Sequence, residues 1–165
     1  MHGLNQLTAA LVATIVISGS DAPETKISGS QYWFFKLLSR LEVTRAGDRM
    51  IAGVIRRADR AEKFVADRKD VDSPTSKVQG ALRAIDFYLA LLRDAETDTK
   101  LHVARDELQR LTGEDFASLD EWRSWLHENR AFVIFSDEKQ RLVLDAEAKK
   151  HGIPALEYRR EKHRS

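Results

Sequence analysis

Residues 73–92 read SPTSKVQGALRAIDFYLALL, and this stretch decides the fold class. Serine is a favoured N-cap and proline is favoured at the first helical position, so Ser73 and Pro74 predict where a helix begins. The apolar side chains that follow recur at the spacing of one helix face: Val78, Ala81, Leu82, Ile85, Leu89 and Leu92. Such a stripe is stable only when it is covered, so we expect neighbouring helices to pack against it.

Two further helices are expected upstream of this one. The first begins near Ser30, which can act as its N-cap, and has an apolar face of Trp33, Phe34, Leu37, Leu38 and Leu41. After a break at residues 44–47, a second helix repeats the pattern with Met50, Ile51, Val54, Ile55, Ala58, Ala61 and Val65. The consecutive rings of Trp33, Phe34 and Phe35 point to more than one side of the first helix, which leaves room for one of them to be exposed.

Two helices are also expected downstream. The fourth helix starts at Thr97 or Asp98 and ends at Gly113, because a left-handed C-terminal cap favours glycine. The fifth starts at Ser118, which has Glu121 three residues later. This is the spacing of a capping box, in which the serine hydroxyl and the glutamate each bond the other residue's backbone N–H.

The hydrophobic period changes after Asn129. Residues 131–135 and 141–144 are two β-favouring runs, and the polar residues 136–140 separate them. This pattern predicts a β-hairpin.

One more helix is expected after the hairpin. Asp145 can cap it, Gly152 ends it, and Pro154 marks the stop. The predicted fold class is therefore mainly α, with antiparallel helix pairs in a short solenoid or bundle and a small C-terminal β-hairpin.

The second half of the chain also carries a family resemblance. Residues 111–116 read LTGEDF, and WRSW at 122–125 and Asn129 follow. These residues resemble the end of a bacterial HEAT-type helical-repeat protein, and residues 133–148 are similar to the tails found after it. The resemblance implies a HEAT-like helix pair within 76–152 and a role as a protein-binding scaffold, with no catalytic residues.

The first 22 residues are expected to lie outside the folded domain. Residues 7–17 form an uncharged apolar run followed by small residues, which is typical of a signal peptide and short for a membrane span. The alternative is an ordinary buried N-terminal helix. With a signal peptide at 1–22 and a linker at 23–29, residues 30–165 form a single helical domain. The protein is then secreted or periplasmic; in the alternative it is cytoplasmic.

Charge and cysteine content exclude several function classes. The 27 basic and 26 acidic residues give a formal net charge of +1, so the whole chain is not drawn to phosphate or to an anionic membrane. There are no cysteines, which excludes disulfides and thiolate chemistry. Arg56, Arg57 and Arg60 could form a local basic ridge on the second helix. Interleaved acidic residues favour the alternative that this is a solvated face.

No catalytic or metal-binding motif is found. His127 and Glu128 begin a zinc-protease pattern, but Ala131 stands where the second histidine belongs. The five histidines have no ligand spacing, and no phosphate-binding or dinucleotide-binding glycine motif occurs. We therefore predict no catalytic residues, no metal site and no cofactor.

The tryptophans are the remaining candidates for a binding site. Trp122 and Trp125 share a face of the fifth helix, and with Trp33 they could form an aromatic binding surface. The alternative is that the rings cover the core and the hairpin. The sequence thus favours a non-enzymatic helical scaffold or interaction module that binds an unknown protein. The alternatives are a hydrolase-type enzyme with a carboxylate and histidine cleft, and a weak nucleic-acid-binding domain.

Overall fold

The computed structural model describes residues 26–38, 65 and 67–164. The predicted signal segment, the basic ridge of Arg56, Arg57 and Arg60, and all of the predicted second helix except Val65 lie outside these ranges. Val65 forms an isolated parallel bridge with Ile27. Within them the fold is mainly helical with a two-stranded antiparallel sheet near the C-terminus, so the predicted fold class is confirmed.

The elements follow the chain in the order that the sequence indicates, with additions at three places. They are α2 (Gly29–Leu38), α5 (Arg68–Val71), α6 (Pro74–Arg93), α7 (Asp98–Thr112), α8 (Leu119–Asn129), η2 (Arg130–Phe132), β1 (Val133–Ser136), β2 (Arg141–Leu144), α9 (Ala146–His151) and α10 (Ala155–Lys162). The short helix α5, the 3₁₀ turn η2 and the helix α10 were not expected from the sequence.

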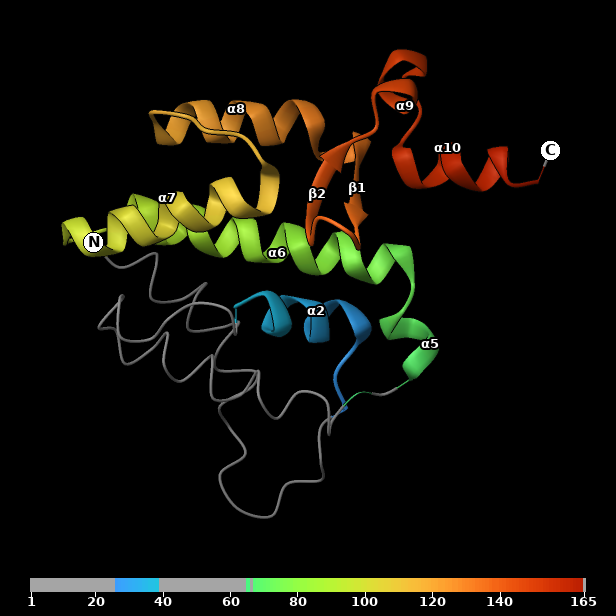
Figure 1. The fold of residues 1–165 in the computed structure, drawn as a ribbon, viewed down its shortest axis with the longest axis horizontal. Coiled ribbons are helices and arrows are strands. Elements are labelled where there is room, and N and C mark those ends of the chain that lie inside the picture. Colours follow the sequence, from blue (N-terminus) through green and yellow to red (C-terminus); the bar gives the residue numbers. More distant parts are fainter. Residues whose placement is uncertain (1–25, 39–64, 66, 165) are drawn as a thin grey trace.

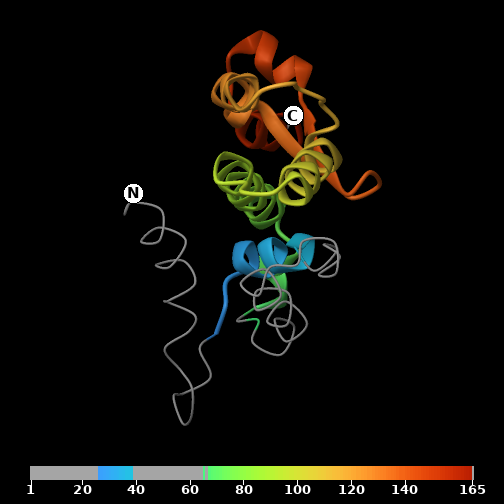
Figure 2. The same cartoon turned by 90° about the vertical axis from the view of Figure 1, so that its left-hand side faces the viewer.

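Helix α6 is the central element. It contacts α2 and α5 on one side, α7 beside it, and α8 and both strands on the other side (Figure 1). Figure 2 shows α6 and α7 side by side as a middle layer, with α2 below and α8, α9 and α10 above. The apolar stripe of α6 is accordingly buried at Val78, Ala81, Leu82, Ile85 and Leu89.

Local capping signals position the helix ends as expected. The Ser73 hydroxyl accepts from the Ser76 N–H at 3.1 Å, with proline at the first helical position of α6. Gly113 ends α7 in the left-handed region with φ 78°. Ser118 and Glu121 form both bonds of the predicted capping box at the start of α8.

The start of α2 differs from the prediction. Helix α2 begins at Gly29, so Ser30 lies within its first turn. Instead, Ser28 and Gln31 exchange hydrogen bonds: the Ser28 N–H donates to Gln31 Oε1 (2.8 Å), and the Gln31 N–H donates to Ser28 Oγ (3.3 Å). This is the capping-box pattern placed two residues earlier.

Asp70 ties the beginnings of two helices together. Its carboxylate accepts from the Gly29 N–H of α2 at 2.5 Å and from the Ser76 hydroxyl of α6 at 3.0 Å. One carboxylate thereby satisfies a backbone N–H at the start of α2 and a hydroxyl in the first turn of α6, a favourable placement for a negative charge.

The aromatic residues of α2 are all buried in the core. Trp33, Phe34 and Phe35 are each buried, so the expectation that one ring could be exposed is wrong. The rings have partners in several directions, because the Trp33 ring contacts Phe135 of β1 (centroids 5.1 Å apart) while Phe34 contacts both Phe35 (5.3 Å) and Phe87 of α6 (6.3 Å). A single apolar stripe underestimates burial when a helix is covered on more than one side.

The hairpin is confirmed, with β1 shifted by two residues at its start. Val133 pairs with Leu144 and Ser136 with Arg141, around a four-residue loop at 137–140. Gln140, the last loop residue, has φ 52°, which allows the chain to turn back into β2.

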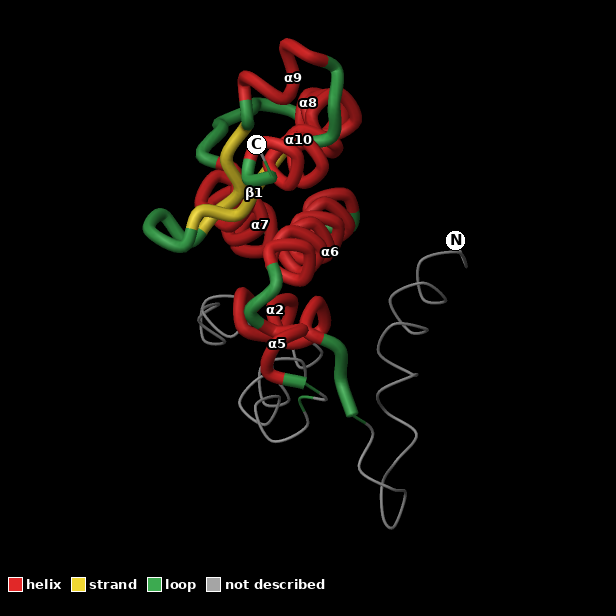
Figure 3. The backbone as a smooth tube through the Cα atoms, turned by 90° about the vertical axis from the view of Figure 1, so that its right-hand side faces the viewer, coloured by secondary structure: helices red, strands yellow, loops and turns green. Residues whose placement is uncertain are grey.

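The C-terminus contains a helix that the sequence did not predict. Gly152 ends α9 with φ 67°, as expected, but Pro154 precedes a new helix rather than closing the fold. Proline supports both outcomes, because its fixed φ also suits the residue at a helix start. Figure 3 shows α10 alongside β1 and above α6.

Candidate functional site

A groove of about 270 Å³ lies where α6, β1 and α10 meet. Its lining comes from the first two turns of α6, from β1 and its loop, and from one side of α10: Pro74, Thr75, Lys77, Val78, Ile134, Phe135, Asp137, Leu156, Arg159, Arg160 and His163. It joins residues that are up to 89 positions apart (163 − 74), so only the fold creates it. In Figure 1, α10 lies above the right-hand end of α6, with β1 to the left of α10.

An ion pair joins α10 to the residue that caps α9. Arg159 Nε donates to Asp145 Oδ2 at 2.8 Å, and Asp145 Oδ1 also accepts from the Ala148 N–H at 3.1 Å as the N-cap of α9. Burial alone would raise the pKa of Asp145, but the bonds from Arg159 and the backbone of α9 outweigh it and hold that pKa below its usual range. The carboxylate therefore stays charged and anchors α10 beside β1.

The α6 side of the groove has a second ion pair. Lys77 Nζ donates to both carboxylate oxygens of Asp137, at 2.7 and 2.8 Å. The same ammonium lies 5.4 Å from the centroid of the Trp33 ring. Lys77 is therefore fixed between the hairpin loop and an aromatic face, a geometry that favours a cation.

Two further side chains, from α10 and from the residue that caps its C-terminus, make fewer bonds. Arg160 Nη2 makes one bond, of 3.3 Å, to the Thr75 hydroxyl of α6. His163 contributes its backbone N–H to the end of α10, and in the described part of the chain its imidazole has no bond to another side chain. These two side chains retain donors for a ligand in the groove.

The apolar residues of the groove are only partly covered. Ile134, Phe135 and Leu156 are half-buried, whereas most apolar side chains of the core are fully buried. An apolar lining with a few convergent polar groups is the usual composition of a binding site. This groove can thus take an apolar group that carries a negative charge.

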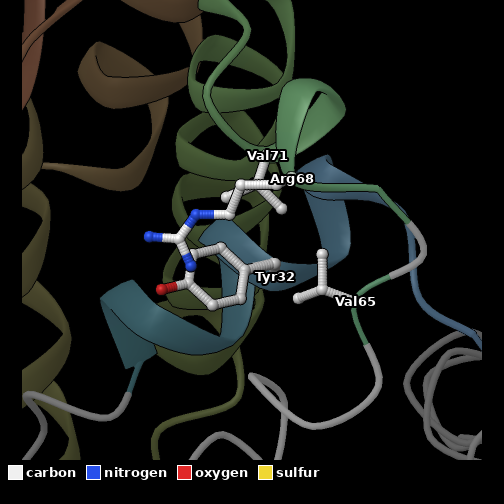
Figure 4. A pocket seen from close by; sticks show the side chains of 4 residues that line it. All are labelled: Tyr32, Val65, Arg68 and Val71. Carbon is white, nitrogen blue, oxygen red and sulfur yellow. The ribbon is translucent and has the colours of Figure 1, made fainter.

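A second pocket, of about 210 Å³, lies between α2 and α5. Tyr32, Val65, Arg68 and Val71 line it, and Figure 4 shows the Arg68 side chain reaching over the Tyr32 ring. Both chain neighbours of Val65 lie outside the described residues. We assign no ligand to this pocket.

The structure separates the three tryptophans that the sequence nominated. The Trp33 and Trp122 side chains are buried, at 4% and 2% exposed, and Trp125 is half-buried. Phe116 lies against Trp122 (ring centroids 4.8 Å apart) and near Trp125 (6.5 Å). Trp33 and Trp122 therefore offer no ring surface to a partner in this fold, which fits the alternative that they cover the core.

A partly buried polar cluster lies away from the groove. Arg110 of α7 pairs with Glu107 (2.6 Å) and donates to the Leu37 carbonyl of α2 (3.4 Å). Burial, and then the negative charge of Glu107, raise the pKa of the neighbouring Tyr88 hydroxyl far above its usual range. Tyr88 is therefore neutral at all working pH values, and the cluster serves to join α7 to α2.

The described residues contain no group of three or more histidine or carboxylate side chains placed to hold a metal ion. His127, the histidine of the incomplete zinc-protease pattern, is exposed on α8 and lines neither pocket. No helix within the described ranges is long and apolar enough to cross a bilayer.

Sequence reasoning missed most of the groove. None of the groove residues Thr75, Phe135, Leu156, Arg159 and Arg160 was among the predicted binding residues. The sequence did contain a signal for α10. Pro154 is a residue type favoured at helix starts, and Leu156 and the two arginines follow it within the next two turns.

Comparison of the chain with protein-family models, with curated proteins and with solved structures finds no match.

Proposed function

We propose that this chain is a non-enzymatic helical module that binds a short segment of a partner protein in the groove between α6, β1 and α10. The observation that carries the proposal is the composition of the groove: partly exposed apolar side chains surrounded by cations from two helices. This is also the role that the resemblance to HEAT-type scaffolds implies.

The size of the groove supports a short ligand rather than a broad domain interface. Stable interfaces between folded proteins bury roughly 800 Å² on each partner. A groove of about 270 Å³ is instead suited to a few residues. Recognition of short segments commonly uses a small number of pockets on a rigid support, and the helices α6 and α10 supply that support here.

A peptide-display selection tests the proposal. Random 12-residue peptides are selected against the full-length chain, and the selected peptides are titrated by fluorescence anisotropy. We expect Leu156→Glu, which places a charge in the groove, to weaken binding at least about tenfold, the equivalent of about 1.4 kcal/mol. Leu144→Glu is the matched control, because Leu144 is 41% exposed and lies outside the groove.

The control should bind as the unmodified chain does. Circular dichroism of both variants verifies that the helices remain, and Ile134→Lys gives a second change in the groove if Leu156→Glu does not fold. Peptides that bind all these variants equally, or a selection that enriches no peptide, would show that the groove is not a binding site.

A further inference from the structure

The groove lies along the outer edge of β1. Neighbouring side chains of a strand point to opposite faces, yet Ile134 and Phe135 both line the groove. A space that both of them line must border the edge of the strand. On its other edge β1 is paired with β2, so the groove faces the unpaired edge.

The register of the hairpin shows which backbone groups point into the groove. The Asp145 N–H donates to the Phe132 carbonyl at 2.8 Å, so residues 132 and 145 are a hydrogen-bonded pair. Hydrogen-bonded and non-hydrogen-bonded pairs alternate in an antiparallel ladder, which makes Phe135 and Leu142 a non-hydrogen-bonded pair. The N–H and C=O of Phe135 therefore point away from β2, and no bond from them to another described residue is found.

The charges of the groove leave a net positive site. Lys77 is neutralised by Asp137, and Arg159 by Asp145. Arg160 has no carboxylate partner among the described residues and bonds only the Thr75 hydroxyl. Its guanidinium, with the imidazole of His163 one turn away, is the part of the groove that a carboxylate would complement.

We propose that the ligand of this groove is an acidic segment in extended conformation, which pairs its backbone with Phe135 of β1 and places a carboxylate at Arg160 and His163. This inference rests on the proposed function and names the partner's chemistry. An apolar side chain of the segment packs on Ile134 and Leu156. Addition of a strand to an exposed sheet edge is a common way of binding peptides, because main-chain bonds supply affinity and side-chain pockets supply selectivity.

The Asp137 carboxylate distinguishes this ligand from a nucleic acid. A phosphate backbone carries a negative charge at every nucleotide, and in the groove it would meet this carboxylate as well as the cations. A peptide can place one carboxylate at Arg160 and apolar side chains elsewhere. The groove therefore fits a peptide better than a polyphosphate.

Three labelled octapeptides test the inference on the full-length chain. The first alternates glutamate and valine, the second alternates lysine and valine, and the third is the first with every backbone nitrogen methylated, so that it cannot donate backbone hydrogen bonds along either edge. We expect the first peptide to bind at least about tenfold more tightly than either of the others, as the loss of a charge-assisted or backbone bond would give.

Charge reversal on α10 provides the matched variants. Arg160→Glu should weaken binding of the glutamate peptide at least about tenfold and strengthen binding of the lysine peptide. Lys162→Glu makes the same charge change on the same helix but outside the groove, so it should leave the preference for the glutamate peptide in place.

The possible failures are distinguishable. If display-selected peptides depend on Leu156 but are not acidic, or bind equally well after N-methylation, the present inference is wrong and the proposed function stands. A twelve-nucleotide oligothymidine that competes as well as the glutamate peptide would show general anion binding and overturn the inference. A dimer in light scattering that Leu156→Glu dissociates would show that the occupant is a second copy of the chain. If no peptide binds at all, both proposals fail.

Discussion

Arg159 of α10 and Asp145, the N-cap of α9, form an ion pair that joins the two C-terminal helices. The Arg159 Nε donates to Asp145 Oδ2 across 2.8 Å, and the Asp145 side chain is only 9% exposed. Because Asp145 also caps α9, one carboxylate fixes both C-terminal helices. The groove depends on this pair, since α10 contributes Leu156, Arg160 and His163 to it.

Arg159→Ala should loosen α10. The variant leaves the Asp145 carboxylate without its cation, but the arginine side chain is half-exposed, so we expect a loss of only about 1 kcal/mol in the free energy of unfolding. Urea denaturation measures the loss. Arg164→Ala, at the exposed end of the described chain, removes an equal charge and should change stability by less than about 0.5 kcal/mol. Equal effects of the two variants would contradict the anchoring role of Arg159.

Asp145 should make the free energy of unfolding depend on pH. Its pKa is lowered in the folded state, so the unfolded chain takes up the proton first as pH falls. The stabilisation is then fully present above the unfolded value of about 4 and is lost as pH falls through the folded pKa. The Asp145→Asn variant lacks this pH-dependent stabilisation. We expect it to be less stable than the unmodified chain at pH 7, with the difference narrowing below about pH 4. A difference that stays constant from pH 7 to pH 3 would contradict this assignment.

The elements that local signals define were predictable from sequence. Ser73, Ser118 and Gly113 act within one helical turn, and each has the role that its residue type favours. Ser28 and Gln31 obey the same rule, and the signal was present in the sequence although Ser30 was chosen instead. These capping hydrogen bonds can be predicted from sequence because the two bonded residues are only three positions apart.

The groove could not be predicted, because its residues meet only through tertiary packing. Thr75 and Arg160 are 85 positions apart and touch across two helices. Nor does the sequence show what covers an aromatic face. Trp122 lies under Phe116, and Trp33 under Phe135, so the apolar faces that suggested a binding surface are parts of the core. Periodicity predicts which side of a helix is apolar but not which element packs on it.

Gly80 should be required for the close packing of α6 on α2. A Cβ at this position would lie 2.8 Å from the Ser30 carbonyl oxygen and 2.9 Å from the Phe34 nitrogen, and it would also meet the Trp33 Cβ. Alanine normally stabilises a helix by about 1 kcal/mol relative to glycine, but the two backbones here would have to separate. We expect Gly80→Ala to lower the free energy of unfolding by about 1–2 kcal/mol. Gln79→Ala, at the exposed neighbouring position, is the control and should have little effect. A stabilised Gly80→Ala variant would refute the close approach.

Ser118→Ala should remove the capping box of α8. The Ser118 hydroxyl accepts from the Glu121 N–H at 3.2 Å, and the Glu121 carboxylate accepts from the Ser118 N–H at 2.9 Å. Loss of an N-cap serine costs about 0.5–2 kcal/mol, which thermal or urea denaturation can resolve. The bonds to Ser118 lower the pKa of Glu121, so in the variant the pKa of that carboxyl should move back toward its usual value, as measured by NMR titration. An unchanged Glu121 pKa would show that the Ser118 hydroxyl does not contribute to lowering it.

Trp33→Phe tests how the core supports the groove. The Trp33 Nε1–H donates to the Val71 carbonyl at 2.7 Å inside the protein, and the same ring lies under Phe135, the residue whose backbone borders the groove. Phenylalanine cannot make this bond, so the Val71 carbonyl is left without its donor and the smaller ring leaves space beneath β1. We expect a loss of about 1–3 kcal/mol in the free energy of unfolding. Trp125→Phe is the matched control, because Trp125 is half-buried and lies on the other side of the fold in α8. The loss of stability in this control should be smaller.

In the folded Trp33→Phe variant the glutamate peptide should also bind more weakly, whereas Trp125→Phe should leave the affinity for that peptide unchanged. Equal stability losses in the two variants, or equal peptide affinities, would mean that Trp33 is not the support on which β1 and the groove rest.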